Sequence, residues 1–265
     1  MATATQTPPS DATEVRMTFG EHLEELRWRL VKSLIAFGVA FVVAAVYYEK
    51  LLRIVVQPHF RAMKLLGVEE AQAKLLQLSY TGPVWALMKL SFIVALFVAS
   101  PIVAYQLWKF VSAGLYKNER KYVTRFAPVS FLLFAGGCVF GFYILIPYGL
   151  YGMSQMANDP KHTTLMFALT DYLNLVMTLT VVTGIIFQLP LIMVFTSVLG
   201  FTSAKTWLKW IRFAIVAIFV AAAILTPSPD WLSQVLLAVP LLVLYLLGIA
   251  LCAMFGKPRE RPARA

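Results

Sequence analysis

Long apolar stretches separated by short polar segments dominate the pattern of this chain. The first begins with apolar residues spaced three and four apart, at Phe19, Leu23, Leu26, Leu30, Leu34, Phe37 and Phe41. This period predicts one helix, amphipathic from His22 to Arg29 and fully apolar over about 30–48. Thr18 and Glu21 have the spacing of a capping box, which predicts the helix start.

Five further apolar stretches follow, so the pattern predicts six membrane spans. The fifth span, Ile211 to Leu225, has only fifteen residues and covers about 22 Å of a hydrocarbon core of about 30 Å. We expect local bilayer thinning, or a turn below the outer surface, at its end. The other four are predicted at about 84–110 (interrupted by Pro101), 126–146, 172–199 and from after residue 230 to about 255.

The polar segments predict the connections. Residues 49–83 are interpreted as an external loop with short amphipathic helices, and 147–170 as a second external loop. Gly114 to Tyr122 is interpreted as a short basic loop. The predicted domains are a disordered cytoplasmic tail (1–17), a six-span membrane domain (18–255) and a basic cytoplasmic tail (256–265).

Composition supports a membrane protein. Hydrophobic residues make up 60% of the 265 residues, charged residues only 14%, and the mean hydropathy is +0.74. Soluble domains have about 45–50% apolar and about 25% charged residues. Since the apolar runs are continuous rather than alternating, the predicted fold class is an all-α polytopic bundle and not a β-barrel.

The net charge of +10 is explained by topology rather than by nucleic-acid binding. Sixteen of the 23 Lys and Arg residues lie in the two tails with their flanks and in the loops on the same side. The positive-inside rule therefore places both termini in the cytoplasm, N-in and C-in.

The sequence carries no pattern for catalysis, metals or cofactors. It has no phosphate-binding glycine loop and no nucleophile–base spacing. Its three histidines are scattered, and its two cysteines lie within apolar runs. We therefore expect neither an enzyme nor a cofactor.

Two acidic residues on the basic face are candidate binding residues. Glu25 lies four residues before Arg29, and Glu119 lies among cations in the second–third loop. Each could form a local ion pair of at most ~1 kcal/mol. Each could instead receive a guanidinium group from a partner in a partly desolvated niche. Spacing alone leaves both interpretations open.

Four motifs, in order along residues 18–255, resemble the TatC family, the receptor subunit of the twin-arginine (Sec-independent) protein translocase. They are HLEELRWR (22–29), PIVAYQLWKF (101–110), LYKNER (115–120) and LTPSPDWLSQ (225–234). The resemblance implies a cupped bundle in the bacterial plasma (inner) membrane that binds Arg-Arg signal peptides of folded cargo. It also implies recruitment of single-span partners of the TatA or TatB type, and assembly of several copies of the chain in the active complex.

The resemblance implies particular site residues. Glu25 and Glu119 match signal-peptide-binding positions, with Arg27, Gln106 and Phe110 at or beside the same surface. Gln188 matches a position that is commonly Glu and that faces a partner subunit; an intrachain hydrogen bond is the alternative. Partner contact is also implied near Ile224, Leu225 and Thr226, and structural roles for Pro58 and Asp230.

A small-solute secondary transporter or channel is the alternative function. Such proteins have internal repeats, broken helices with charged pairs and a polar midplane site. Only the segment Gln188–Pro190 points that way.

Overall fold

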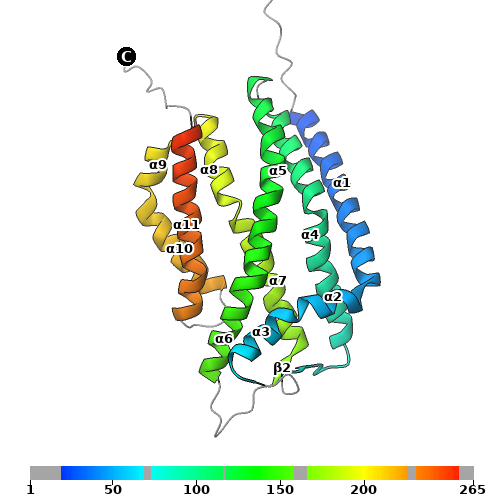
Figure 1. Cartoon of the computed structure of the whole chain (residues 1–265). Coiled ribbons are helices and arrows are strands. Elements are labelled where there is room, and N and C mark those ends of the chain that lie inside the picture. The colour runs from blue at the N-terminus through cyan, green and yellow to red at the C-terminus, as the bar shows by residue number, and fades with distance from the viewer. Residues whose placement is uncertain (1–18, 69–72, 116, 158–165, 226–230, 257–265) are drawn as a thin grey trace, which may run out of the picture.

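The structure, a computed structural model, describes residues 19–68, 73–115, 117–157, 166–225 and 231–256, and only the backbone of 19, 117–124, 156–157 and 232–233. Helix α1 (Phe19–Val46) lies along α4 (Gly82–Ala113) over most of its length (Figure 1). The ring of Phe37 on α1 meets that of Phe92 on α4 edge-on, with centroids 5.3 Å apart. Thr18 of the predicted capping box, the predicted tail 1–17 and all of the predicted tail 256–265 except Gly256 fall outside the described residues.

The six predicted spans are confirmed within the described part of the chain. Five helical segments are long and apolar enough to cross a membrane, namely Gly20–Val46, Gly82–Ala113, Arg125–Gln155, Leu169–Val198 and Gln234–Phe255. The sixth, α10 (Ile211–Leu225), is the short one. Helix α1 begins and α11 (Trp231–Phe255) ends at the same end of the bundle (Figure 1), as an even number of spans requires.

Helix α4 continues through Pro101, so the predicted interruption is wrong. A proline cannot donate a backbone hydrogen bond to the carbonyl four residues earlier, here that of Phe97. The hydroxyl of Ser100 donates to this carbonyl at 2.6 Å. The carbonyl is therefore satisfied, and the helix continues past the proline.

The helix that contains the third span is longer at both ends than the predicted span. Helix α5 (Lys117–Phe140) includes most of the expected basic loop. One π-helical turn, η1 (Gly141–Leu145), connects it to α6 (Ile146–Ala157), so the expected loop 147–170 begins as helix. The N–H of Ile146 donates to the carbonyl of Gly141, five residues back, and Pro147 can occupy the next turn without breaking the run.

The fourth span is broken in the middle. Helices α7 (Leu169–Ile186) and α8 (Leu189–Val198) are separated at Phe187 and Gln188. Pro190, in the first turn of α8, has no N–H to continue the α7 pattern. The N–H of Gln188 instead donates to the carbonyl of Ile185 at 3.0 Å, which tightens the chain locally.

Small residues set the packing of α5 and η1 against α7. Gly137 and Gly141 have the GxxxG spacing that allows close helix approach. A Cβ atom on Gly141 would lie 2.5 Å from Thr183 Oγ1, and one on Gly137 would lie 2.6 Å from the carbonyl oxygen of Thr183. The two backbones therefore meet where no larger residue fits.

The last spans are joined by hydrogen bonds between side chains and backbone. Helix α9 (Ala204–Lys209) is capped by Ser203, which accepts from the N–H of Thr206 at 3.3 Å. The hydroxyl of Tyr245 on α11 donates to the backbone carbonyl of Trp207 on α9 at 2.8 Å. The side-chain amide of Gln234 on α11 donates to the backbone carbonyl of Phe219 on α10 at 3.1 Å.

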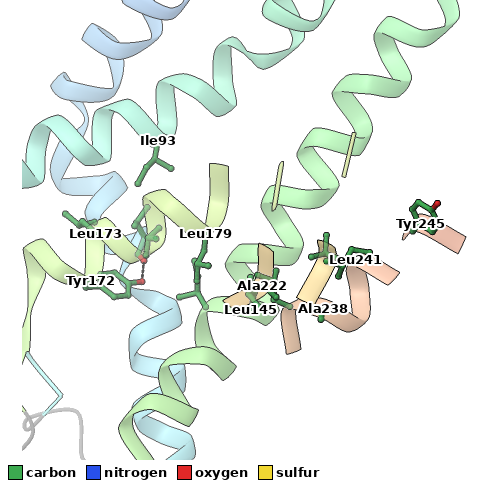
Figure 2. Close-up of a cluster of buried hydrophobic side chains, with 14 of the residues drawn as sticks. Ile93, Leu145, Tyr172, Leu173, Leu179, Ala222, Ala238, Leu241 and Tyr245 are labelled. Carbon is green, nitrogen blue, oxygen red and sulfur yellow. Dashed lines mark hydrogen bonds between the residues drawn. The ribbon is translucent and has the colours of Figure 1, made fainter. Parts of the chain in front are cut away.

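The external end carries a cap of short elements. Helices α2 (Tyr48–Val55) and α3 (Gln57–Leu65) confirm the predicted amphipathic helices. A parallel pair of two-residue strands, β1 (Leu75–Leu76) and β2 (Phe167–Ala168), joins the two external segments and was not predicted. Beneath the cap, buried apolar residues of α4, α7, α10 and α11 form the main core (Figure 2).

Candidate functional site

The predicted signal-binding residues with described side chains lie where α1 begins and α4 ends. We call His22, Glu25, Arg29, Gln106 and Phe110 the mouth. The end of α4 and the start of α5 are joined by a short turn, so the first turn of α5 lies at the same end of the bundle (Figure 1). The cationic loops predicted to be cytoplasmic are also at this end.

Glu25 is a half-buried carboxylate with one occupied oxygen. Its side chain is 20% exposed and that of Arg29 is 14% exposed. Arg29 donates to Glu25 Oε1 through Nε at 3.0 Å and also through a terminal nitrogen. Oε2 is buried and has no hydrogen-bond partner among the described residues. The carboxylate therefore forms the predicted local ion pair and keeps an acceptor for a second donor.

An aromatic contact fixes the start of α1 against the end of α4. The rings of His22 and Phe110 are stacked, with centroids 4.5 Å apart and planes 19° from parallel. His22 also lies against Gly114, where an added Cβ would be 3.7 Å from His22 Cε1. This contact determines where Glu25, one turn later on α1, is presented.

The remaining predicted signal-binding residues differ in placement. Gln106 lies one turn before Phe110 on α4 and is half-buried, while Arg27 is exposed. Glu119 belongs to the first turn of α5, so its backbone is at the mouth end. Its side chain is outside the described part of the structure.

Gln188 is used within the chain. Its Oε1 accepts from Ser130 Oγ at 2.7 Å, and its Nε2 donates to the carbonyl of Ser130 at 3.0 Å. This is the intrachain alternative that the sequence left open, and it links the α7–α8 break to α5. The side chain is half-buried, and its two hydrogen bonds satisfy both ends of the amide.

The other predicted partner-contact residues lie at a different level of the membrane. Leu225 is at the outer end of α10 and lines a cavity of about 440 Å³, whereas Ile224 is 77% exposed. Thr178 and Leu179 of α7 line the same cavity, and Gln188 is nine residues beyond Leu179, or about 14 Å along a helix. The structure therefore does not bring Gln188 and Leu225 together. Thr226 and Asp230 lie outside the described residues.

Pro58 sits in the cap, fully buried in the first turn of α3. Beside it His59 is also buried, and its Nε2 lies 2.8 Å from the carbonyl oxygen of Ala73. Burial lowers the pKa of His59 below its usual 6.5, and the bond to Ala73 opposes this effect. The hydroxyl of Tyr172 donates to the carbonyl of Val55 at 2.5 Å, which ties α7 to α2.

Three features were missed by sequence reasoning. The stacking of His22 on Phe110 and the bonds of Ser130 to Gln188 were not predicted, because contacts between distant residues leave no periodicity in the sequence. Asp171, Asn174 and Thr178 are spaced three and four apart on α7, and all line the cavity at Leu225. That spacing is visible in the sequence and could have identified a polar face.

The fold and the site define the class of protein. The chain is a multi-pass helical membrane protein with a polar, partly desolvated mouth at its cytoplasmic end. Among the described residues, no three His, Cys, Asp or Glu side chains gather where they could hold a metal ion.

The chain belongs to the TatC family. The family model for the Sec-independent protein translocase protein (TatC) matches residues 21–240. The TatC protein of Koribacter versatilis is 36% identical over 248 residues, covering 94% of this chain and 89% of that protein. TatCy of Bacillus subtilis is 34% identical over 252 residues, covering 94% of each. A crystal structure of the twin-arginine translocase receptor TatC is similar with a TM-score of 0.76 and 31% identity, over 88% of this chain and 99% of that one.

Membership settles the general role. The chain is a non-enzymatic component of the twin-arginine protein translocase and a multi-pass protein of the bacterial plasma membrane. As part of a translocase complex, it works with partner subunits. The transporter alternative is therefore not retained.

Proposed function

We propose that the mouth binds the paired arginines of signal peptides on folded cargo. The observation that carries this proposal is the carboxylate of Glu25, with Oε1 held by Arg29 and Oε2 buried without a partner among the described residues. A buried, unused carboxylate oxygen is costly unless a donor arrives, and a guanidinium supplies two donors in a fork.

The charge around Glu25 and Glu119 favours arginine over lysine. Basic neighbours repel a generic cationic peptide, so affinity depends on geometry at the two carboxylates rather than on net charge. Lysine offers a point charge and no planar fork, and its ammonium is more strongly hydrated. We expect Arg27, Gln106 and Phe110 to line the path of the peptide, with His22 keeping α1 in position.

We further propose that single-span partners dock at two levels. Gln188 would exchange its bonds to Ser130 for a polar residue of a partner helix, a contact worth only about 0.6 kcal/mol in membranes. Near the outer end of α10, a partner helix would cover the exposed side chain of Ile224 and reach the cavity at Leu225, with Thr226 as a further proposed contact.

The test for signal binding uses a photoreactive residue placed in the peptide, next to the arginine pair, so that the chain keeps its own glutamates. Full-length protein in lipid nanodiscs is crosslinked to Arg-Arg and Lys-Lys versions of the peptide, and the crosslinks are mapped. We expect Arg-Arg crosslinks within residues 19–29 and 106–125 that drop at least about tenfold for Lys-Lys. Equal crosslinking by both versions, or crosslinks only at the cap, would refute the proposal.

A further inference from the structure

The external surface of α2 and α3 carries a row of four basic residues with one glutamine among them. We call Lys50, Arg53, Gln57, Arg61 and Lys64 the external basic stripe; their spacing of three and four residues places them on one helical face. All five are exposed. Val56, between the helices, keeps helical dihedral angles, its N–H donates to Leu52, and its carbonyl accepts from Phe60. The row therefore continues across the junction.

The opposite face of these helices is already used. Val55, Pro58, His59, Ala62 and Met63 are buried, and α3 packs against α6. The stripe is thus the outward surface of the cap. It also runs against the positive-inside pattern that the rest of the chain follows.

The cations of the stripe form no salt bridge with any acidic residue that the structure describes. Within the described ranges, the ion pair of Arg29 with Glu25 is the only salt bridge, and it lies at the other end of the molecule. Arg61 instead lies over the ring of Tyr143, with its guanidinium carbon 5.0 Å from the ring centroid. This contact orients the cation and leaves its hydrogen-bond donors available.

A hollow of about 530 Å³ opens at the α3 half of the stripe. Its polar rim comes from Gln57, Arg61 and Lys64, and its apolar floor from Phe60, Met63, Val68 and Ala73. Beside the stripe, a second row of exposed apolar side chains, Tyr47, Ile54 and Leu65, follows at spacings of seven and eleven residues, close to whole turns. Cations next to an apolar edge are the pattern of a helix lying in a membrane interface.

We propose that the external basic stripe binds the phosphates of anionic phospholipids in the outer leaflet, with the apolar row inserted among the acyl chains. The chain path supports a lipid rather than a protein ligand. Helix α1 ends at Val46 and α2 begins at Tyr48, so the stripe starts where the first span leaves the hydrocarbon core. Each cation near an anionic bilayer surface strengthens binding to that surface about fivefold. The four cations of the stripe together should therefore give a strong preference for anionic over neutral lipid.

The test places a fluorophore on Gln57→Cys in the full-length protein, since the native Cys138 and Cys252 are buried. Two series of bilayers are compared, one with increasing fractions of brominated phosphatidylglycerol and one with increasing fractions of brominated phosphatidylcholine. The brominated acyl chains quench the dye on contact. We expect half-maximal quenching at a phosphatidylglycerol fraction about tenfold lower than for phosphatidylcholine. The preference should disappear in K50Q/R53Q/R61Q/K64Q and persist in the charge-retaining K50R/K64R variant.

A matched control removes cations elsewhere. K205Q/K209Q/R212Q, at α9 and the start of α10, should keep the full preference. Equal quenching by both lipids would overturn the proposal in favour of an acidic protein segment. Reversal of the phosphatidylglycerol effect by millimolar glycerol phosphate would overturn the proposal in favour of a soluble phosphate ligand. A phosphatidylglycerol preference that survives removal of all four cations would overturn the proposal outright.

Discussion

The mouth and the cap stabilise polar groups in opposite ways. In the cap, buried polar groups find partners within the chain: His59 contacts the carbonyl of Ala73, and Tyr172 donates to that of Val55. In the mouth, the carboxylate of Glu25 keeps a buried oxygen without a described partner. The comparison indicates that the cap holds the helices together; under the proposed function, the free acceptor in the mouth is where a ligand binds. Substitutions in the two regions should therefore separate stability from binding.

The largest effect on stability is expected from Met63→Ala in the cap. Met63 is 1% exposed and packs with Ala62 and Ala73 in a small separate core. Truncating a buried side chain of this size costs about 2–5 kcal/mol. Thermal unfolding in detergent should show a clear fall in Tm, while Leu65→Ala, on the same helix but exposed, should change little. A stable Met63→Ala protein would mean that the cap does not hold the bundle.

Glu25→Gln should weaken peptide binding and leave stability nearly unchanged, the reverse of Met63→Ala. Charge-assisted hydrogen bonds contribute about 1.5–3 kcal/mol, so affinity for an Arg-Arg peptide should fall at least about tenfold. The amide of Gln can still accept from Arg29, so the loss of the charge should cost only about 1 kcal/mol of stability. Peptide titration by fluorescence anisotropy and a parallel melting curve measure the two quantities. Glu24→Gln, an exposed neighbour, is the control, and equal losses in both variants would contradict a specific role for Glu25.

Acidification should loosen the cap. The pKa of His59 is lowered by burial, so the unfolded chain binds its proton more readily than the folded one. The contribution of neutral His59 is therefore fully present above about pH 6.5 and decreases as the pH falls below that value. Hydrogen exchange of α3 at pH 7.5 and 5.5 should show faster exchange at the lower pH. His59→Gln should remove the pH dependence; if the dependence persists, another group is responsible.

The smallest effect is expected from Tyr172→Phe. It removes one hydrogen bond to the carbonyl of Val55 and keeps the ring, so the expected cost is about 1 kcal/mol. Stability should fall slightly, and peptide affinity should remain unchanged. A loss of binding in this variant would show that the cap and the mouth are coupled through α7.

The sequence predicted the spans well because a long apolar run has few alternatives to a membrane helix. Local breaks were harder: Pro101 was expected to interrupt α4, but Ser100 satisfies the carbonyl that the proline leaves. The extension of the third span through the π-helical turn and α6, and the strand pair between 75–76 and 167–168, depend on contacts between distant segments. No local pattern encodes them.

For the site, motifs indicated which residues to examine but not how they are arranged. Glu25 and Arg29 were recognisable as a pair from their spacing, and the structure forms that pair. The stack of His22 on Phe110 and the bonds between Gln188 and Ser130 join residues 88 and 58 positions apart. Such contacts follow from helix packing, which single-sequence periodicity does not specify.

The glycine contact between α5 and α7 has a practical consequence for handling this protein. Its strength comes from the close approach of two backbones at Gly137, Gly141 and Thr183, not from removing apolar surface from water. Detergent tails and lipid tails are equivalent surroundings for such a contact. The α5–α7 pair should therefore pass through extraction and purification as one rigid piece, a fixed reference against which movements of the other helices can be measured.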